Sequence, residues 1–86
     1  MSKYLIEVTD TFGGEANYSW VKRWVCDAKS ARAAITKLAK SEGSGWKLAY
    51  DLGDDARYNL KGACICAFVN YVDDGDMHLY ADTKTL

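Results

Sequence analysis

The sequence predicts one α+β domain over residues 1–86, in which an antiparallel sheet of four to five strands carries one helix on one face. Several segments alternate apolar and polar side chains with the period of two that half-buried strands show, and one segment has the spacing of an amphipathic helix. Aromatic residues, which favour strands, make up 13% of the chain, and no proline is present to interrupt strand pairing. The expected order of elements is β-β-α-β-β-β.

The start of the chain predicts a β-hairpin. Residues Lys3 to Thr9 alternate strictly, so that Tyr4 and Ile6 belong to one apolar face. The glycine pair Gly13-Gly14 interrupts this segment, and a second strand is expected from Tyr18 to Cys26. Because the two segments are close along the chain, we expect them to pair through the loop that holds the glycines.

A helix is expected directly after this hairpin. Ser30 is a typical N-cap residue, and Gly43 and Gly45 are typical of the residues that end a helix. Between them, apolar residues recur at i, i+3, i+4 and i+7 and form a stripe along one face. The stripe consists of Ala31, Ala34, Ile35 and Leu38. We expect this stripe to pack on the sheet.

Three further strands are expected in the second half of the chain. Trp46 to Leu52 alternates, with its apolar residues predicted to point inward, whereas Arg57 to Lys61 fits either a strand or a loop. Ala63 to Val72 is apolar on both faces in its first half, which predicts a central strand. Asp73 to Asp76 is expected to form a hairpin turn. Met77 to Ala81 would then return as a short edge strand.

The composition indicates a folded cytoplasmic protein. Hydrophobic residues make up 49% of the chain and charged residues 27%, which is too apolar for a disordered chain. The longest apolar run, Ala63 to Val69, is far shorter than the roughly 20 residues of a membrane helix. The N-terminus lacks the features of a signal peptide. The three cysteines have no framework spacing, which predicts reduced thiols.

The residues that could carry catalysis or bind a metal do not form a recognisable motif. Cys26, Cys64, Cys66 and His78 add up to a Cys₃His ligand set, which zinc accepts. However, the two neighbouring cysteines lie inside a predicted apolar strand instead of a C-x₂₋₄-C knuckle, and the single histidine is expected on the edge strand. The glycine pair also lacks the spacing of a phosphate-binding loop. We therefore expect no enzyme activity, no metal and no cofactor.

Charge is distributed unevenly along the chain. Residues 1–50 hold eight Lys or Arg and five Asp or Glu, a balance of +3, whereas residues 51–86 hold three and seven, a balance of −4. Five of the acidic residues fall in two predicted turns: Asp54 and Asp55 in one, and Asp73, Asp74 and Asp76 in the other. These residues would bind a basic partner surface if the two turns meet. The simpler interpretation is a set of solvated turns.

Aromatic and basic residues in the second strand suggest an alternative, nucleic-acid-binding site. The candidates are Tyr18, Trp20, Lys22 and Arg23. Aromatic and basic side chains together form platforms for single strands. By alternation, however, Arg23 lies on the face opposite Trp20, and an aromatic stripe of this kind more often forms core. The net charge of −1 and the pI near 5.7 also lack the basic footprint of a nucleic-acid-binding domain.

The segment from Tyr4 to Val21 resembles a segment of short proteins found in phages and mobile elements. The most recognisable part is Phe12-Gly13-Gly14-Glu15-Ala16-Asn17-Tyr18-Ser19-Trp20. The resemblance covers about a fifth of the chain and assigns no catalytic residue. It implies a phage context, in which small non-enzymatic proteins often bind a host machine, as anti-CRISPR proteins do.

These observations predict a phage-encoded inhibitor that binds a host defence complex, such as a CRISPR effector subunit, in the bacterial cytoplasm. The five aspartates of the two turns are its expected contact residues. Two alternatives remain open at this point. One is a nucleic-acid-binding accessory protein, and the other is a virion assembly protein that associates through the Met77–Ala81 edge strand.

Overall fold

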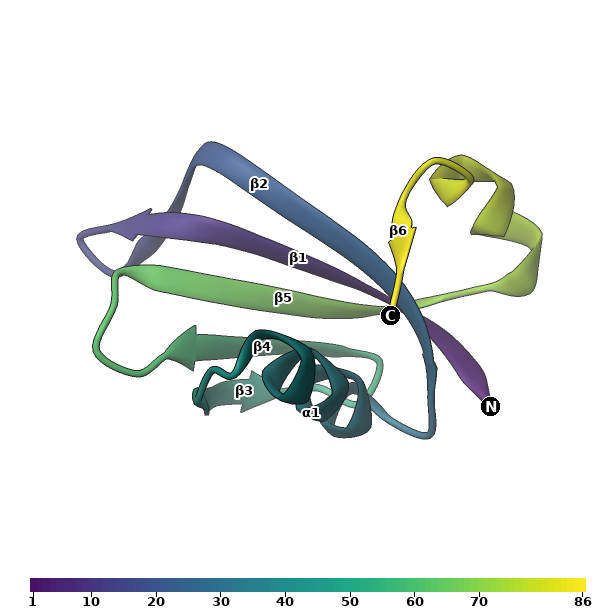
Figure 1. Ribbon diagram of the computed structural model, residues 1–86, viewed down its shortest axis with the longest axis horizontal. Coiled ribbons are helices and arrows are strands. Elements are labelled where there is room, and N and C mark those ends of the chain that lie inside the picture. Colours follow the sequence, from purple (N-terminus) through teal and green to yellow (C-terminus); the bar gives the residue numbers. More distant parts are fainter.

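Figure 1 shows the computed structural model of residues 1–86, a six-stranded sheet with one α-helix across one face. The α+β class agrees with the prediction, but the sheet has six strands instead of four to five. The elements are β1 (Ser2–Phe12), β2 (Glu15–Ala28), α1 (Ala31–Glu42), β3 (Trp46–Asp51), β4 (Asp55–Leu60), β5 (Ile65–Val72), the 3₁₀ helix η1 (Asp74–Tyr80) and β6 (Lys84–Thr85). The strand order is β3-β4-β5-β1-β2-β6, and only β2 and β6 are parallel. Neither helix has the length and apolar character needed to cross a lipid bilayer.

Strand β5 lies inside the sheet, between β4 and β1, as the sequence predicted for Ala63 to Val72. It pairs antiparallel with both neighbours. Cys66 on one face and Val69 on the other are both fully buried. In the first half of β5 both faces are covered, since the neighbours Cys66 and Ala67 are both buried, so apolar residues follow one another there without alternation.

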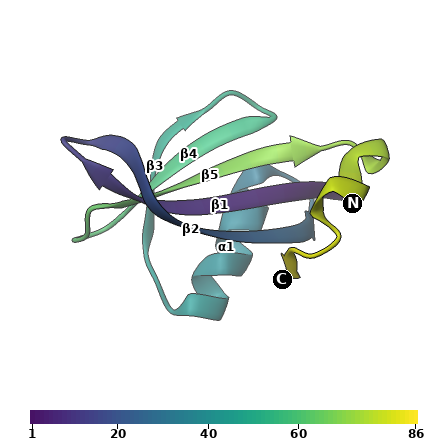
Figure 2. The same ribbon diagram turned by 90° about the horizontal axis from the view of Figure 1, so that it is seen from above.

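Helix α1 covers one face of the central strands, as the view from above shows (Figure 2). The Ser30 hydroxyl accepts a hydrogen bond from the Ala33 amide at 3.1 Å, and Gly43 ends the helix with a left-handed φ of 66°. The predicted apolar stripe of α1 is buried against one face of the sheet. This core includes Ala31, Ala34, Ile35 and Leu38 of the helix and Tyr4, Ile6, Val8, Cys26, Tyr58, Ala67 and Val69 of the strands. The predicted helix and its packing face are thus confirmed.

The β1–β2 hairpin contains a large bulge that the sequence pattern did not predict. Thr9 lies opposite Val21, but Thr11 lies opposite Ala16, so Asp10 alone faces four residues of β2. Within these four, Tyr18 has a positive φ of 56°. Strand β2 begins before this bulge, at Glu15, rather than at Tyr18. A bulge of this kind bends the strand and increases its twist.

Asp10 holds the bulge together. Its carboxylate accepts hydrogen bonds from the Asn17 side chain at 2.8 Å and from the Ser19 amide at 2.9 Å. These bonds, with those of Ser19 first and those of Asn17 second, lower the pKa of Asp10 to about 2. Beyond the bulge, the Gly14 carbonyl accepts a hydrogen bond of 2.7 Å from the guanidinium of Arg57 in β4. The end of the hairpin is therefore tied to a strand that is not its neighbour in the sheet.

The inward alternation predicted for Trp46 to Leu52 is wrong, although the strand itself exists. Strand β3 lies at the edge of the sheet and has a register shift between Leu48 and Tyr50. One extra residue reverses the faces of those that follow, so Tyr50 and Leu48 cannot share one side. Both are exposed, as is Leu52 beyond the end of the strand.

The predicted hairpin turn at Asp73–Asp76 and the edge strand at Met77–Ala81 are also wrong. The chain forms η1 instead, and the Asp76 amide donates to the Asp73 carbonyl at 2.9 Å. Met77 and Tyr80 pack beside a small second core on the face away from α1, which consists of Leu5, Val25 and Val72. These two residues are three apart, which places them on one side of a 3₁₀ helix but on opposite sides of a strand.

Candidate functional site

The two groups of predicted contact aspartates meet at one end of the sheet. The Tyr71 amide of β5 donates a hydrogen bond of 2.8 Å to the Asp54 carbonyl, in the turn between β3 and β4. The next residue, Asp55, lies opposite Asn70 of β5. Asp73 follows directly after β5 ends at Val72. Strands β4 and β5 are antiparallel neighbours, so the turn that precedes β4 lies beside the end of β5.

Tyr71 lies among these carboxylates. Its pKa is raised first by the negative charge of Asp73, with further contributions from Asp74 and Asp54. Tyr71 is 41% exposed, and its ring makes an edge-to-face contact with Tyr4, with ring centroids 6.0 Å apart. Since Tyr4 is buried, Tyr71 is held in place by the core while part of its ring faces solvent.

We call this surface the acidic end and define it as Asp54, Asp55, Asp73, Asp74, Asp76 and Tyr71. Asp76 lies one turn of η1 beyond Asp73. All five carboxylates belong to exposed residues. The two ion pairs of the protein are Lys3–Asp27 at 2.5 Å and Arg23–Glu7 at 2.8 Å, so none of the five is neutralised by an internal ion pair.

Two residues that the sequence analysis did not select lie next to the acidic end. The Asp51 carboxylate accepts a hydrogen bond from the Gly53 amide at 2.8 Å, which shapes the turn before Asp54. Burial is the main cause that raises the pKa of Tyr4, and the negative charges of Asp54 and Asp51 raise it further. Leu52 in the same turn is 75% exposed. The turn therefore presents an apolar side chain among the acidic ones.

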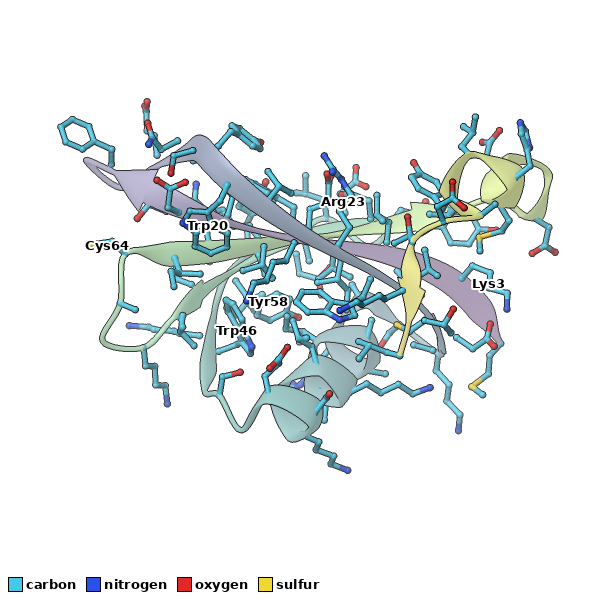
Figure 3. All side chains as sticks on the ribbon, turned by 45° about the horizontal axis from the view of Figure 1, so that its top comes forward. Lys3, Trp20, Arg23, Trp46, Tyr58 and Cys64 are labelled. Carbon is cyan, nitrogen blue, oxygen red and sulfur yellow. The ribbon has the colours of Figure 1, made fainter.

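The structure does not bring the four residues of the alternative nucleic-acid site into one place. Lys22 and Arg23 both line a cleft at the β2–β6 edge, which neither Tyr18 nor Trp20 lines. Arg23 points away from the helix side of the sheet, where Trp46 and Tyr58 lie (Figure 3), and its Nε donates to Glu7 at 2.8 Å. Tyr18 lies in the bulge of β2. Trp20 and Lys22 remain together, because both line a cleft on the helix side. Alternation thus placed Arg23 correctly, whereas the bulge displaces Tyr18.

The cleft that contains Trp20 and Lys22 is lined mainly by apolar residues and has a volume of about 240 Å³. Its lining residues are Val8, Trp20, Lys22, Trp24, Leu38, Glu42, Ser44, Trp46, Leu60 and Ile65. We call it the tryptophan cleft, because all three tryptophans of the chain line it. Trp24 shares the predicted stripe with Trp20. Trp46 follows the helix, so no local pattern links it to the other two.

Two buried polar atoms of the tryptophan-cleft residues have no hydrogen-bond partner within the protein. They are the indole Nε1 of Trp46 and the hydroxyl of Ser44. An indole N–H is a donor only, and leaving a buried donor unpaired carries a desolvation penalty. Such atoms are rare in folded proteins and call for a physical explanation.

A second cleft lies on the other side of α1, where the helix faces the edge hairpin. It has a volume of about 400 Å³ and also includes Trp46. Its other lining residues are Arg32, Ile35, Thr36, Ala39, Leu48, Asp51 and Tyr58. Burial raises the pKa of the Tyr58 phenol, and the charge of Asp51 raises it further. One cation and one anion line this cleft, so it has no net charge preference.

The cysteines and the histidine do not converge. Cys26 faces α1, whereas Cys66 is buried on the opposite face of the sheet, and burial raises the pKa of both thiols. Cys64 is exposed just before β5, not inside a strand as predicted. His78 lies on η1, with Nδ1 2.9 Å from the Gly75 carbonyl oxygen. No three or more His, Cys, Asp or Glu side chains come together in a metal-binding arrangement.

Comparisons with known proteins identify no relative that would indicate a function. No protein-family model matches the chain, and no curated protein and no solved structure matches it either. The acidic end and the tryptophan cleft are therefore the two candidate binding surfaces of the protein.

Proposed function

We propose that the protein is a non-enzymatic inhibitor that uses its acidic end to bind a basic surface of a host defence complex. The observation that carries this proposal is that Asp54, Asp73 and Asp74, from two separate segments, act together on the exposed Tyr71. Asp55 and Asp76 belong to the same two segments, and none of the five has an internal ion pair. Taken separately, the two segments are solvated turns; their convergence gives one acidic surface, which we propose as the binding surface.

The chemistry of the acidic end favours Arg and Lys as partner residues. A carboxylate accepts charge-assisted hydrogen bonds from these side chains, and such bonds are about twice as strong as neutral ones. Because the five carboxylates have no internal ion pair, none has to be broken when a partner binds. The shared negative charge also accelerates association with a positively charged surface.

Tyr71 and Leu52 supply the apolar part of such an interface. Tyrosine is enriched among the residues that dominate binding energy, and these residues usually occupy the centre of an interface. Tyr71 lies beside the β3–β4 turn and two residues before Asp73, and its ring contacts the buried Tyr4. Leu52 adds exposed apolar area at the rim.

The resemblance to short phage proteins directs the proposal to defence complexes. A CRISPR effector holds nucleic acid in a positively charged channel, mainly through Lys and Arg contacts with the phosphate backbone. Carboxylates presented together on a rigid sheet end are suited to occupy those contacts. The inhibitor would thus compete with nucleic acid for the channel without any chemical step.

The proposal is tested by capture from cells that express a panel of CRISPR effectors, with nuclease added. The test variant is D54N/D73N/D74N, and the control is E15Q/E42Q/D82N, which removes the same charge from three exposed residues outside the acidic end. We expect wild type and control to retain one effector subunit in stoichiometric amount, and the test variant to lose it. Equal retention by both variants would show that the acidic end is not the binding surface.

A further inference from the structure

We infer that the tryptophan cleft binds a single nucleobase together with its attached phosphate. The source is either a free mononucleotide or one unit of a single strand. This inference goes beyond the proposed inhibitor function and does not depend on it, because the cleft shares no residue with the acidic end.

The tryptophan cleft lies toward the opposite end of the sheet from the acidic end. The β1–β2 turn and the β4–β5 loop are at one end in Figure 1, and η1 and the N-terminus are at the other. Trp46 begins β3 opposite Leu60, which ends β4, while Val8 lies opposite Lys22. The cleft is therefore built from five strands and the last turns of α1, which are rigid parts of the fold.

The walls of the cleft suit a flat aromatic ring. Trp20 is 40% exposed although it lines an apolar cleft, and Trp24 and Trp46 are partly buried against the helix-side core. Indole rings stack on bases of any sequence, because every base has a π-face. The volume of about 240 Å³ is below the roughly 300–1,000 Å³ typical of drug-sized ligands, so one base is the appropriate size.

The polar groups of the residues around the cleft favour a base over a hydrocarbon group. Trp46 and Ser44 line the cleft, and each carries a buried donor without an acceptor, the indole Nε1 and the hydroxyl. A base edge offers carbonyl and ring-nitrogen acceptors for such donors. Glu42, which also lines the cleft, is an acceptor for the exocyclic or ring N–H groups of a base.

The charges around the cleft favour an attached phosphate. Lys22 lines the cleft. Lys61 lies beside its Ser44–Trp46 wall, since the Lys61 amide donates to the Gly45 carbonyl at 3.0 Å. Glu42 is the single acidic residue among the lining residues and balances Lys22, so the excess positive charge comes from Lys61, whose side chain lies against Gly45. A cationic ligand would meet Lys22, so an aromatic cage for ammonium groups is the poorer interpretation of the three indoles.

The inference is tested with two probes on the whole protein. The first is quenching of tryptophan fluorescence by AMP, GMP, CMP and UMP. The second is fluorescence polarisation of a 5′-labelled twelve-residue oligothymidylate at low salt. Each probe is applied to wild type, to W20A and K22Q as test variants, and to Y18A and K29Q as controls. The controls remove an exposed tyrosine and an exposed lysine that do not line the cleft.

We expect W20A to weaken binding by about 5- to 100-fold, as loss of one base–aromatic stack does. We expect K22Q to reduce the salt dependence of oligonucleotide binding, while Y18A and K29Q behave as wild type. W46F retains an aromatic ring but deletes the indole N–H, so we expect it to weaken binding while circular dichroism stays unchanged.

Saturable quenching by mononucleotides identifies a free nucleotide as the source, and binding of the oligonucleotide alone identifies a strand. Either result supports the inference if the test variants lose binding. Two results would overturn it: no binding of either probe, or equal losses in test and control variants.

Discussion

The backbone amide of Tyr71 donates a hydrogen bond of 2.8 Å to the carbonyl of Asp54, seventeen residues earlier in the chain. This bond fixes the β3–β4 turn beside the end of β5. It is the contact that turns two separate acidic segments into one surface. The negative charges of both segments raise the pKa of this tyrosine, so its pKa reports on their convergence.

The first prediction concerns that reporter. Because Asp73, then Asp74 and Asp54, raise the pKa of Tyr71, we expect D73N/D74N to lower this pKa toward the ordinary value of 10.0. Residue-specific NMR titration of tyrosine ring carbons measures it directly. E15Q is the control, because Glu15 begins β2 directly after the hairpin turn, at the other end of the sheet. An unchanged Tyr71 pKa in D73N/D74N would mean that the two segments do not surround the ring.

The second prediction concerns the bulge of β2. The folded pKa of Asp10 is about 2, below its ordinary value of 3.8. Its carboxylate therefore stabilises the fold above about pH 4, and this contribution is lost as the pH falls toward 2. We expect D10A to lower the urea midpoint at pH 7, and the difference from wild type to shrink at pH 2. The control D82A removes an exposed carboxylate outside the bulge; a pH-independent effect of D10A would contradict the prediction.

The third prediction tests the packing of α1. Leu38 is 1% exposed, and its replacement by alanine leaves a cavity between helix and sheet. We expect L38A to lower the free energy of unfolding by about 2–5 kcal/mol, whereas L79A, at a 65% exposed position, changes it by less than about 0.5 kcal/mol. Urea denaturation of both variants measures the difference. Similar losses at the two positions would contradict this packing.

The fourth prediction concerns the end of α1. Gly43 has a φ of 66°, a conformation that costs an L-residue about 1–2 kcal/mol. We therefore expect G43A to lower the free energy of unfolding by about this amount. G75A is the matched control, because Gly75 has open space and no left-handed φ. Thermal and urea denaturation compare the two; equal stability of G43A and wild type would show that the helix ends differently.

Local patterns predicted the elements whose period is regular and whose partners are nearby. The alternation that contains Tyr4 and Ile6 identified β1, and the stripe that contains Leu38 identified α1 with its packing face. The pattern failed where extra residues interrupt the period. The four residues opposite Asp10 displace Tyr18, and the register shift after Leu48 reverses the faces that follow. Neither irregularity is marked in the sequence by a proline or a glycine pair at its position.

The candidate surfaces depend on the strand order, which no local pattern contains. Asp54 and Asp73 were identified as candidates from charge alone, but their convergence requires β4 and β5 to be neighbours. Trp46 was predicted as a strand residue and not as a binding residue. It joins Trp20 only because α1 carries the chain from the β2 side of the sheet to the β3 edge.

The most direct test of the central claim is a displacement measurement on the effector subunit that the protein captures. Fluorescently labelled target DNA is bound to the guide-loaded effector, and wild type, D54N/D73N/D74N or E15Q/E42Q/D82N is titrated in. The acidic-end proposal predicts stoichiometric release of DNA by wild type and by the E15Q/E42Q/D82N control, and no release by D54N/D73N/D74N at the same concentrations. Release of DNA by all three proteins with equal efficiency would contradict it.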